Sequence, residues 1–95
     1  MIRQDLEQFN LPLNPGVYFF KDSSGKILYI GKATVLRARV RSYFAADLVK
    51  GRGSRIVGMV EKAVSLDWTV TDSVLEALIL EANLIKQHQP PYNVD

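Results

Sequence analysis

The chain has 95 residues, one histidine and no cysteine, which fits a single domain over residues 1–95 and excludes disulfides, thiolate-bound zinc and any multi-histidine metal site. A metal held by this chain would therefore have oxygen ligands, which favours magnesium or manganese. The net charge of +2 is too small to favour any class of partner by itself. No apolar run is long enough to cross a bilayer and residues 1–7 are polar, so we expect a cytoplasmic protein without a signal peptide or membrane contact.

Hydrophobic spacing and turn-forming residues predict six elements in the order β-β-α-α-β-α, after a short helical or irregular lead-in over residues 1–10. The turn formers of residues 21–26 join the first two strands as a hairpin. The fold class is therefore α+β, a small three-stranded antiparallel sheet flanked by helices. We expect strands at 16–20, 27–30 and 66–71, and helices at 34–46, 54–64 and 73–89.

The predicted helices have capping residues at their starts and apolar stripes along one face. Thr34 and Ser54 are candidate N-caps, and Ser73 with Glu76 has the spacing of a capping box. We expect these stripes to be buried: Leu36, Val40, Tyr43 and Phe44 on the first helix, Ile56, Val57, Val60 and Val64 on the second, and Leu75, Leu78, Ile79, Ala82 and Ile85 on the last.

Positive charge is concentrated in the middle of the chain. Residues 32–62 carry eight basic and two acidic side chains, whereas residues 63–95 carry one basic and five acidic ones. A basic segment suits a nucleic acid backbone, although a solvated helix face explains such a cluster equally well. The candidate DNA contacts are Arg37, Arg41, Lys50, Arg52 and Arg55.

Among the acidic residues, Glu81 is the one for which a purely structural role is hardest to identify. It lies at the edge of the apolar stripe of the last helix, where a half-buried carboxylate needs a partner. A salt bridge to an arginine or a single metal ion would supply one. Glu76 already serves in the capping box, and five residues along a helix correspond to about 140° of rotation, so the two carboxylates cannot share a metal pair.

Several other polar residues are unremarkable when taken singly. Tyr18 and Tyr29 lie on paired strands, each near a glycine that permits close approach, and would otherwise be ordinary strand aromatics. Lys32 and Arg39 would be solvated charges. None of these residues alone indicates an enzyme.

Together, however, they form a longer pattern. Gly16-Val-Tyr18 is followed by Tyr29-Ile-Gly31, and the pattern continues through residues 39–44, 80–86 and 91–93. It resembles the GIY-YIG endonuclease family, and its longer stretches resemble the N-terminal nuclease domains of the UvrC type, over residues 15–93 in order and spacing. Thr34-Val35, Gln89 and Pro91 depart from the family pattern by lacking positive charge, which weakens the expected affinity for DNA.

The resemblance implies hydrolysis of a DNA phosphodiester with one divalent metal ion, magnesium or manganese, as in the 3′ incision of bacterial nucleotide excision repair. By position, Glu81 would be the sole protein ligand of the metal. Tyr29 would activate the attacking water, with Tyr18 assisting or replacing it. Arg39 would bind the scissile phosphate through its planar fork of donors. The remaining site residues implied by the resemblance are Lys32, Tyr43 and Asn93.

The resemblance also implies partners and alternatives. DNA would be the substrate, and other excision-repair subunits would bind regions outside this chain, which we expect to be an excised domain and a monomer. A stand-alone GIY-YIG nuclease acting on branched or damaged DNA also fits the sequence. A catalytically silent nucleic-acid-binding module is the third possibility, and it would be favoured if Tyr29, Arg39 or Glu81 were missing.

Overall fold

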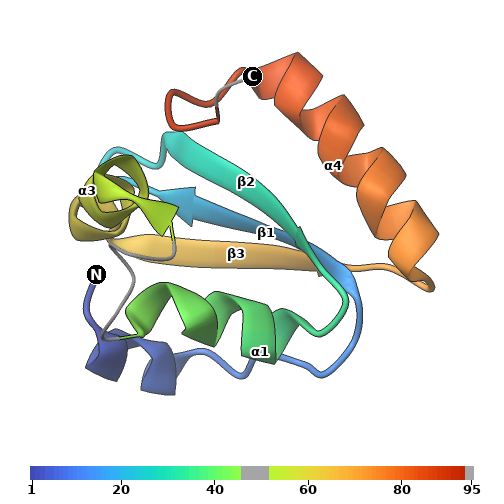
Figure 1. Ribbon diagram of the computed structural model, residues 1–95, viewed down its shortest axis with the longest axis horizontal. Helices are drawn as coiled ribbons and strands as arrows, with labels where there is room; N and C mark the ends of the chain where they lie inside the picture. The colour runs from blue at the N-terminus through green and yellow to red at the C-terminus, as the bar shows by residue number, and fades with distance from the viewer. Residues whose placement is uncertain (46–51, 94–95) are drawn as a thin grey trace.

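A three-stranded antiparallel sheet forms the centre of the computed structural model, which describes residues 1–45 and 52–93 (Figure 1). The strands lie in the order β2-β1-β3, so β1 is in the middle and the hairpin of β1 and β2 leaves β2 at an edge. The predicted sheet is confirmed, with each strand shifted or extended by one to three residues. The strands are β1 (Gly16–Lys21), β2 (Ile27–Ala33) and β3 (Ser65–Val70).

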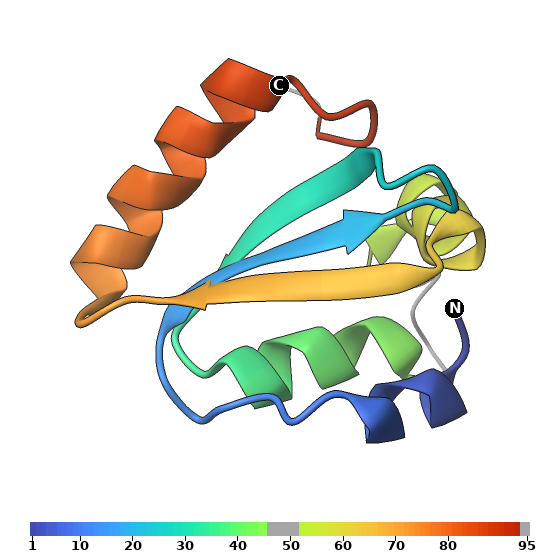
Figure 2. The ribbon, with the colours of Figure 1, turned by 180° about the vertical axis from the view of Figure 1, so that it is seen from behind.

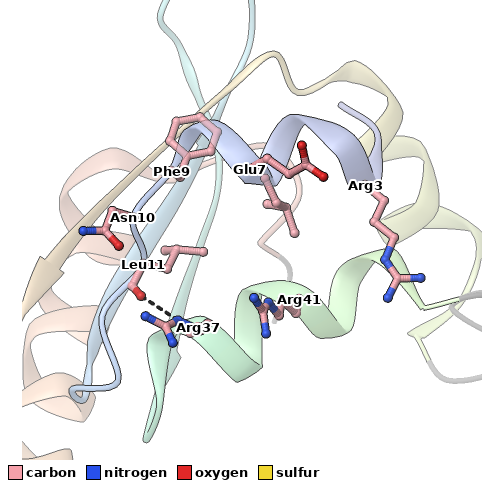
Figure 3. Close-up of a pocket in the computed structure, with 8 residues that line it drawn as sticks. Arg3, Glu7, Phe9, Asn10, Leu11, Arg37 and Arg41 are labelled. Carbon is pink, nitrogen blue, oxygen red and sulfur yellow. Dashed lines mark hydrogen bonds between the residues drawn. The ribbon is translucent and has the colours of Figure 1, made fainter.

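Helices cover both faces of this sheet (Figures 1 and 2). Helix α4 packs on one face, against β2 and β1. The short 3₁₀ helix η1 and the segment after it lie along α1 on the other side, where Arg37 Nε donates a hydrogen bond to the Leu11 carbonyl (2.9 Å; Figure 3). The helices are η1 (Arg3–Gln8), α1 (Leu36–Arg41), the 3₁₀ helix η2 (Ser42–Phe44), α3 (Ser54–Lys62) and α4 (Val74–His88). None of the helices in the described part of the chain has the length and apolar character needed to cross a membrane.

Alternation along β1 divides the buried side chains into two cores, because successive strand residues point to opposite faces. Val17 packs with Ile30 and Ala77 beneath α4. Tyr18 and Phe20 belong to the larger core on the other face. That core also holds the predicted stripe of the first helix, in which Leu36, Val40 and Tyr43 are fully buried and Phe44 is half-buried.

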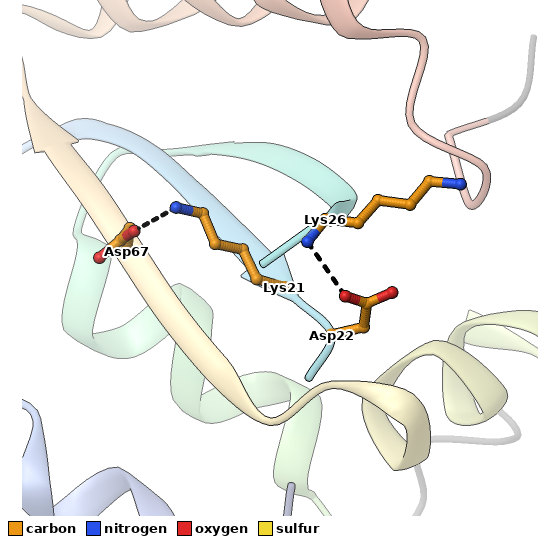
Figure 4. Close-up of polar contacts among 4 residues, drawn as sticks. All are labelled: Lys21, Asp22, Lys26 and Asp67. Carbon is orange, nitrogen blue, oxygen red and sulfur yellow. Dashed lines mark hydrogen bonds and ion pairs between the residues drawn. The ribbon is translucent and has the colours of Figure 1, made fainter. Parts of the chain in front are cut away.

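The hairpin turn is held by one carboxylate. Asp22 accepts hydrogen bonds from the backbone and hydroxyl of Ser24. It also accepts one from the backbone of Lys26 (Figure 4). These bonds, led by the one from the Ser24 side chain, lower the pKa of Asp22. At the start of the turn, Lys21 Nζ lies 2.6 Å from Asp67 Oδ2. This ion pair links the neighbouring strands β1 and β3. The turn predicted for residues 21–26 is confirmed.

The helix starts differ from the predicted ones in two of three cases. The N-cap of α1 is Val35, one residue after Thr34, and no side chain caps it. The N-cap of α3 is Gly53, whose φ of 86° favours glycine, and Ser54 is the first helical residue. Ser73 caps α4 as predicted, since its Oγ accepts from the backbone of Glu76 (3.1 Å). Glu76 returns a contact to the backbone of Asp72 rather than to Ser73.

The predicted buried face of α4 is wrong for four of its five residues, since only Ile85 packs against the sheet. Leu75, Leu78 and Ile79 are 64%, 45% and 54% exposed, and Ala82 is exposed as well. The face that meets the sheet consists of Ala77, which is fully buried, with the half-buried Leu80, Leu84 and Ile85. Because α4 is apolar nearly all round, two stripes fit a helical period, and the small side chain of Ala77 lets the helix approach the sheet closely. On the segment after α3, Val64 is likewise exposed rather than inward.

Two single substitutions on α4, one at Ala77 and one at Leu78, test this orientation. Ala77→Leu is expected to lower the free energy of unfolding by about 1–3 kcal/mol, since added methylenes have no room against Val17 and Ile30. Leu78→Ala is expected to cost about 0.5 kcal/mol or less, as for other exposed positions. Urea denaturation of both variants measures the difference. A larger loss from Leu78→Ala would mean that the predicted stripe, and not this one, faces the sheet.

Candidate active site

Two glycines of the signature are required by close packing. Gly31 lies opposite Tyr18 in the hairpin, and a Cβ on Gly31 would lie 2.2 Å from both Cζ and Oη of Tyr18. A Cβ on Gly16 would lie 2.3 Å from the Thr69 carbonyl oxygen. Any side chain at either position would displace backbone or a buried ring. The expectation that glycine permits close approach to Tyr18 is confirmed.

The Tyr18 ring is thereby fixed within a cluster of aromatic side chains. Its hydroxyl oxygen lies 2.5 Å from that of Tyr43, and both side chains are fully buried. Tyr29 packs its ring against the same cluster, 6.1 Å from the Tyr43 ring, but stays half-buried. Of the three tyrosines named from the sequence, Tyr29 is therefore the one with access to solvent.

The two buried tyrosines are held in their neutral form. Burial raises the pKa of Tyr18, and the hydrogen bond from Tyr43 and the charge of Arg39 offset this only in part. Burial also raises the pKa of Tyr43, and the neighbouring Tyr18 raises it further. For Arg39, burial alone would lower the pKa, but the tyrosine oxygens around it, led by that of Tyr18, raise it. The permanent cation of Arg39 thus lies beside neutral hydroxyl groups.

A cleft of about 520 Å³ opens between the end of β2, α1 and the start of α4. Arg39 lines it from α1 and Lys32 lines it from β2. On the α4 side of β2, Lys32 Nζ lies 3.7 Å from Glu81 Oε1, and the Glu81 side chain is 17% exposed. Lys32 and Glu81, which are 49 positions apart in the sequence, thus lie close together, and Lys32 shares the cleft lining with Arg39. The salt-bridge partner considered for Glu81 was an arginine, and the observed one is a lysine.

The chemistry of Glu81 fits a hard divalent cation. Its carboxylate is a largely buried oxygen donor, and its contact with Lys32 is too long for a hydrogen bond. In residues 1–45 and 52–93, no three acidic or histidine side chains gather at one place. Magnesium keeps several waters and needs only one or two protein carboxylates, so a site built on Glu81 alone is chemically reasonable.

Asn93 acts on the backbone of β2 rather than facing the cleft. Its Oδ1 accepts from the Ile30 amide (2.8 Å), and its Nδ2 donates to the Ile30 carbonyl (2.9 Å). The Tyr92 amide donates to the Leu28 carbonyl (3.0 Å), so residues 92–93 cover the free edge of β2. Asn93 thereby fixes the strand between Tyr29 and Gly31, which makes it a positioning residue.

Asn93→Ala removes both hydrogen bonds to Ile30 and is expected to cost about 1–3 kcal/mol of unfolding free energy. Asn93→Asp is the sharper test, because a carboxylate still accepts from the Ile30 amide but faces the Ile30 carbonyl without a proton to donate. In thermal unfolding, Asn93→Asp should therefore be no more stable than Asn93→Ala. Full stability in Asn93→Asp would show that the amide pairing is not needed.

The predicted DNA-contacting residues that the structure describes lie in different environments. Arg41 and Arg55 are exposed, while Arg37 is half-buried by its bond to Leu11. Arg52 stacks its guanidinium 4.2 Å from the centre of the Tyr43 ring and donates to Ser42 Oγ (3.2 Å). Lys50 lies outside the described residues.

The contact of Arg52 with the tyrosine cluster was not anticipated from the sequence. The two residues are nine positions apart in the sequence, and no periodic pattern links them. Arg52 therefore belongs to the support of the tyrosine cluster as much as to any outer basic surface.

Comparison with known proteins places this arrangement in a family. The family model of the UvrC-like GIY-YIG domain matches residues 14–94. UvrABC system protein C of Microcystis aeruginosa is 50% identical over an alignment 95 residues long, which covers 95% of this chain and 15% of that protein. The corresponding protein of Haloarcula marismortui is 54% identical over 88 residues, 90% of this chain and 14% of that protein. The chain thus spans about one seventh of the length of these curated relatives.

Solved structures give the same result. The GIY-YIG N-terminal endonuclease domain of UvrC from Thermotoga maritima, bound to its catalytic magnesium, matches with a TM-score of 0.83 and 39% identity, covering 99% of this chain and 100% of that one. Forms of that domain with a single tyrosine-to-phenylalanine or asparagine-to-alanine substitution are also bound to the catalytic divalent cation. The signature glycines, the tyrosine cluster and these matches together establish that the chain belongs to the UvrC-like GIY-YIG domain family.

Proposed function

We propose that the chain is an endonuclease domain that hydrolyses DNA phosphodiester bonds with the help of one divalent metal ion, magnesium or manganese. The observation that carries the proposal is the arrangement around the edge of β2. Arg39 and the half-buried Tyr29 lie on its α1 side, and Lys32 and Glu81 lie on its α4 side. The match over the full length of a solved domain described as an endonuclease supports it.

Glu81 is the residue that would hold the ion, which when bound supplies positive charge opposite the phosphate. Lys32, whose Nζ lies 3.7 Å from Glu81 Oε1, would help to orient the carboxylate. The substituted forms of the Thermotoga domain support this assignment, because changes of single tyrosines or of an asparagine leave its cation in place. These residue types are therefore not required to hold the ion in that protein.

The other site residues have separate tasks. Arg39 would bind the scissile phosphate through its guanidinium fork, and its cationic form is secured by the tyrosines around it. Tyr29 would accept the proton of the attacking water at its hydroxyl oxygen. Tyr18 and Tyr43, which are buried and neutral, would hold Tyr29 and Arg39 in place rather than touch the substrate. Asn93 would fix the strand that carries Tyr29.

The activity of the whole protein is a further part of the proposal. We infer that residues 1–95 are one domain of a longer protein, since the relatives are about seven times as long. In that protein the domain would make the 3′ incision of nucleotide excision repair in the cytoplasm, with other repair subunits binding elsewhere and the domain itself acting as a monomer. A stand-alone structure-selective nuclease and a catalytically silent binding module have no specific observation in their favour, and Tyr29, Arg39 and Glu81 are all present.

Nicking of supercoiled plasmid DNA tests the activity. The chain with manganese or magnesium is expected to convert supercoiled to open-circular plasmid, and EDTA is expected to stop the conversion. Arg39→Gln should slow the reaction by about 10²- to 10³-fold, as for loss of other groups that stabilise transition-state charge. Lys62→Gln, which removes an exposed charge on α3, is the matched control. Duplex binding without any metal-dependent nicking would favour the silent binding module.

A further inference from the structure

A second basic cavity lies on the side of α1 away from the catalytic cleft. Its volume is about 410 Å³, and it is bounded by η1, the segment that follows η1, and α1. Figure 3 shows Arg3 reaching in from η1 while Arg37 and Arg41 approach from α1. Its other lining residues are Leu6, Glu7, Phe9, Asn10 and Leu11.

The charge of this cavity is not balanced within the described residues. Three guanidinium groups face one carboxylate, that of Glu7, in the lining. The ion pairs formed by residues 1–45 and 52–93 are Lys21–Asp67 and Lys32–Glu81, and neither includes an arginine of the cavity. Arg37 is anchored through Nε to the Leu11 carbonyl, which aims the guanidinium and leaves its terminal nitrogens to bind a ligand.

The position of the cavity relates it to the catalytic cleft through one helix. Arg37 and Arg41 are one turn apart on the same side of α1, whereas Arg39 lies about 200° round the helix from Arg37 and lines the cleft. A helix with its side chains is about 10–12 Å thick, and successive base pairs of a duplex advance by about 3.4 Å along the duplex axis. A DNA duplex whose axis runs across α1 would thus place a phosphate in the cavity roughly three nucleotides from the one at Arg39.

We propose that Arg3, Arg37 and Arg41 form a second phosphate-binding site, which holds the DNA backbone about three nucleotides from the scissile phosphate. The inference rests on the proposed nuclease function. Guanidinium forks match phosphate oxygens, and the apolar floor of Leu6, Phe9 and Leu11 suits a deoxyribose. Carboxylates of an acidic peptide have similar chemistry. A phosphodiester is favoured because the same helix carries Arg39 on its opposite side.

The test is binding of a fluorescein-labelled 30-base-pair duplex to the 95-residue chain, in EDTA, at several salt concentrations. The isolated Thermotoga domain, which this chain covers completely, has been crystallised, so the domain can be studied alone. Arg3→Gln with Arg41→Gln removes two exposed guanidinium groups and leaves the Arg37 anchor intact. Lys62→Gln with Lys86→Gln removes the same net charge from exposed positions outside both cavities. A third variant, Arg3→Lys with Arg41→Lys, keeps the charge without the fork.

We expect the Arg-to-Gln pair to weaken binding about tenfold at low salt and to reduce the slope of log K against log salt by about 0.9 for each lost phosphate contact. The Arg-to-Lys pair should fall between it and the wild type, and the Lys-to-Gln pair should change affinity less than about twofold. Equal losses in the two Gln pairs, or no loss in either, would overturn the inference. The inference would also be overturned if the Arg-to-Gln pair lost binding to poly-glutamate but kept the wild-type affinity for the duplex. The cavity would then be a site for carboxylates. Duplex binding in EDTA does not require nicking. If the variants bind the duplex as expected but the wild-type chain never nicks DNA, only the proposed function is overturned.

Discussion

Glu81→Gln is expected to abolish metal-dependent nicking while leaving the fold intact. Glutamine keeps the size of the side chain but loses the charge that would hold the ion, and several kcal/mol of charge stabilisation correspond to about 10³-fold or more in rate. Little stability should be lost, because the removed ion pair is long and Lys32 is 48% exposed. Plasmid nicking measures the rate, and calorimetric titration with manganese measures binding of the ion without reference to activity.

Glu76→Gln is the matched control. It lies five residues earlier on the same helix, is exposed, and contacts only the start of α4 through its backbone amide and carboxylate. Its nicking rate and manganese affinity should match those of the wild type. If Glu81→Gln still binds manganese with wild-type affinity, or if Glu76→Gln loses as much activity, Glu81 is a structural ion-pair residue and the proposed metal site is wrong.

The sheet could be predicted because its signals are local. The turn formers between residues 21 and 26 fix the hairpin, and the alternation within 66–71 marks the third strand. The order β2-β1-β3 requires only that β2 and β3 both pair with β1, one on each side. An antiparallel sheet allows this arrangement. Helix ends were less predictable, since Thr34 and Val35 are both compatible with a start and tertiary packing decides between them.

The orientation of α4 could not be predicted from the spacing of its apolar residues. Leu75, Leu78 and Ile79 form as regular a stripe as Leu80, Leu84 and Ile85. What decides between them is the depth to which the helix sinks onto Val17 and Ile30, and that depends on the small side chain of Ala77, a feature without a periodic signature. With this face inward, Glu81 is half-buried, as the sequence suggested for other reasons, and its ion-pair partner is Lys32 rather than an arginine.

The candidate site was located by resemblance, and the structure adds what each residue contacts. Tyr29 was expected to activate the attacking water, with Tyr18 assisting or replacing it and Tyr43 completing the site, whereas burial separates Tyr18 and Tyr43 from Tyr29. Asn93 was expected within the site and instead pairs with the edge of β2. The stacking of Arg52 and the cavity beside Arg3 join segments distant in sequence, so no local pattern could have revealed them.

Tyr29→Phe is expected to lower the nicking rate by about 10²- to 10⁴-fold, the range for loss of a general base, with little change in unfolding free energy. Tyr29 is the half-buried member of the cluster, and its ring contact with Tyr43 survives the substitution. Single-turnover nicking at saturating manganese measures the chemical step, and urea denaturation measures the fold.

Tyr18→Phe and Tyr43→Phe are the matched comparisons, since each removes one hydroxyl from the same cluster. Either change leaves the partner hydroxyl buried without its bond, which costs about 1–3 kcal/mol of unfolding free energy. Their nicking rates should fall by less than that of Tyr29→Phe, because neither buried hydroxyl meets the substrate. If Tyr18→Phe matched the loss of Tyr29→Phe in a folded chain, the base would be Tyr18. Its neutral, fully buried hydroxyl would then have to be uncovered when DNA binds, and the cleft between β2 and α1 would have to open during the reaction.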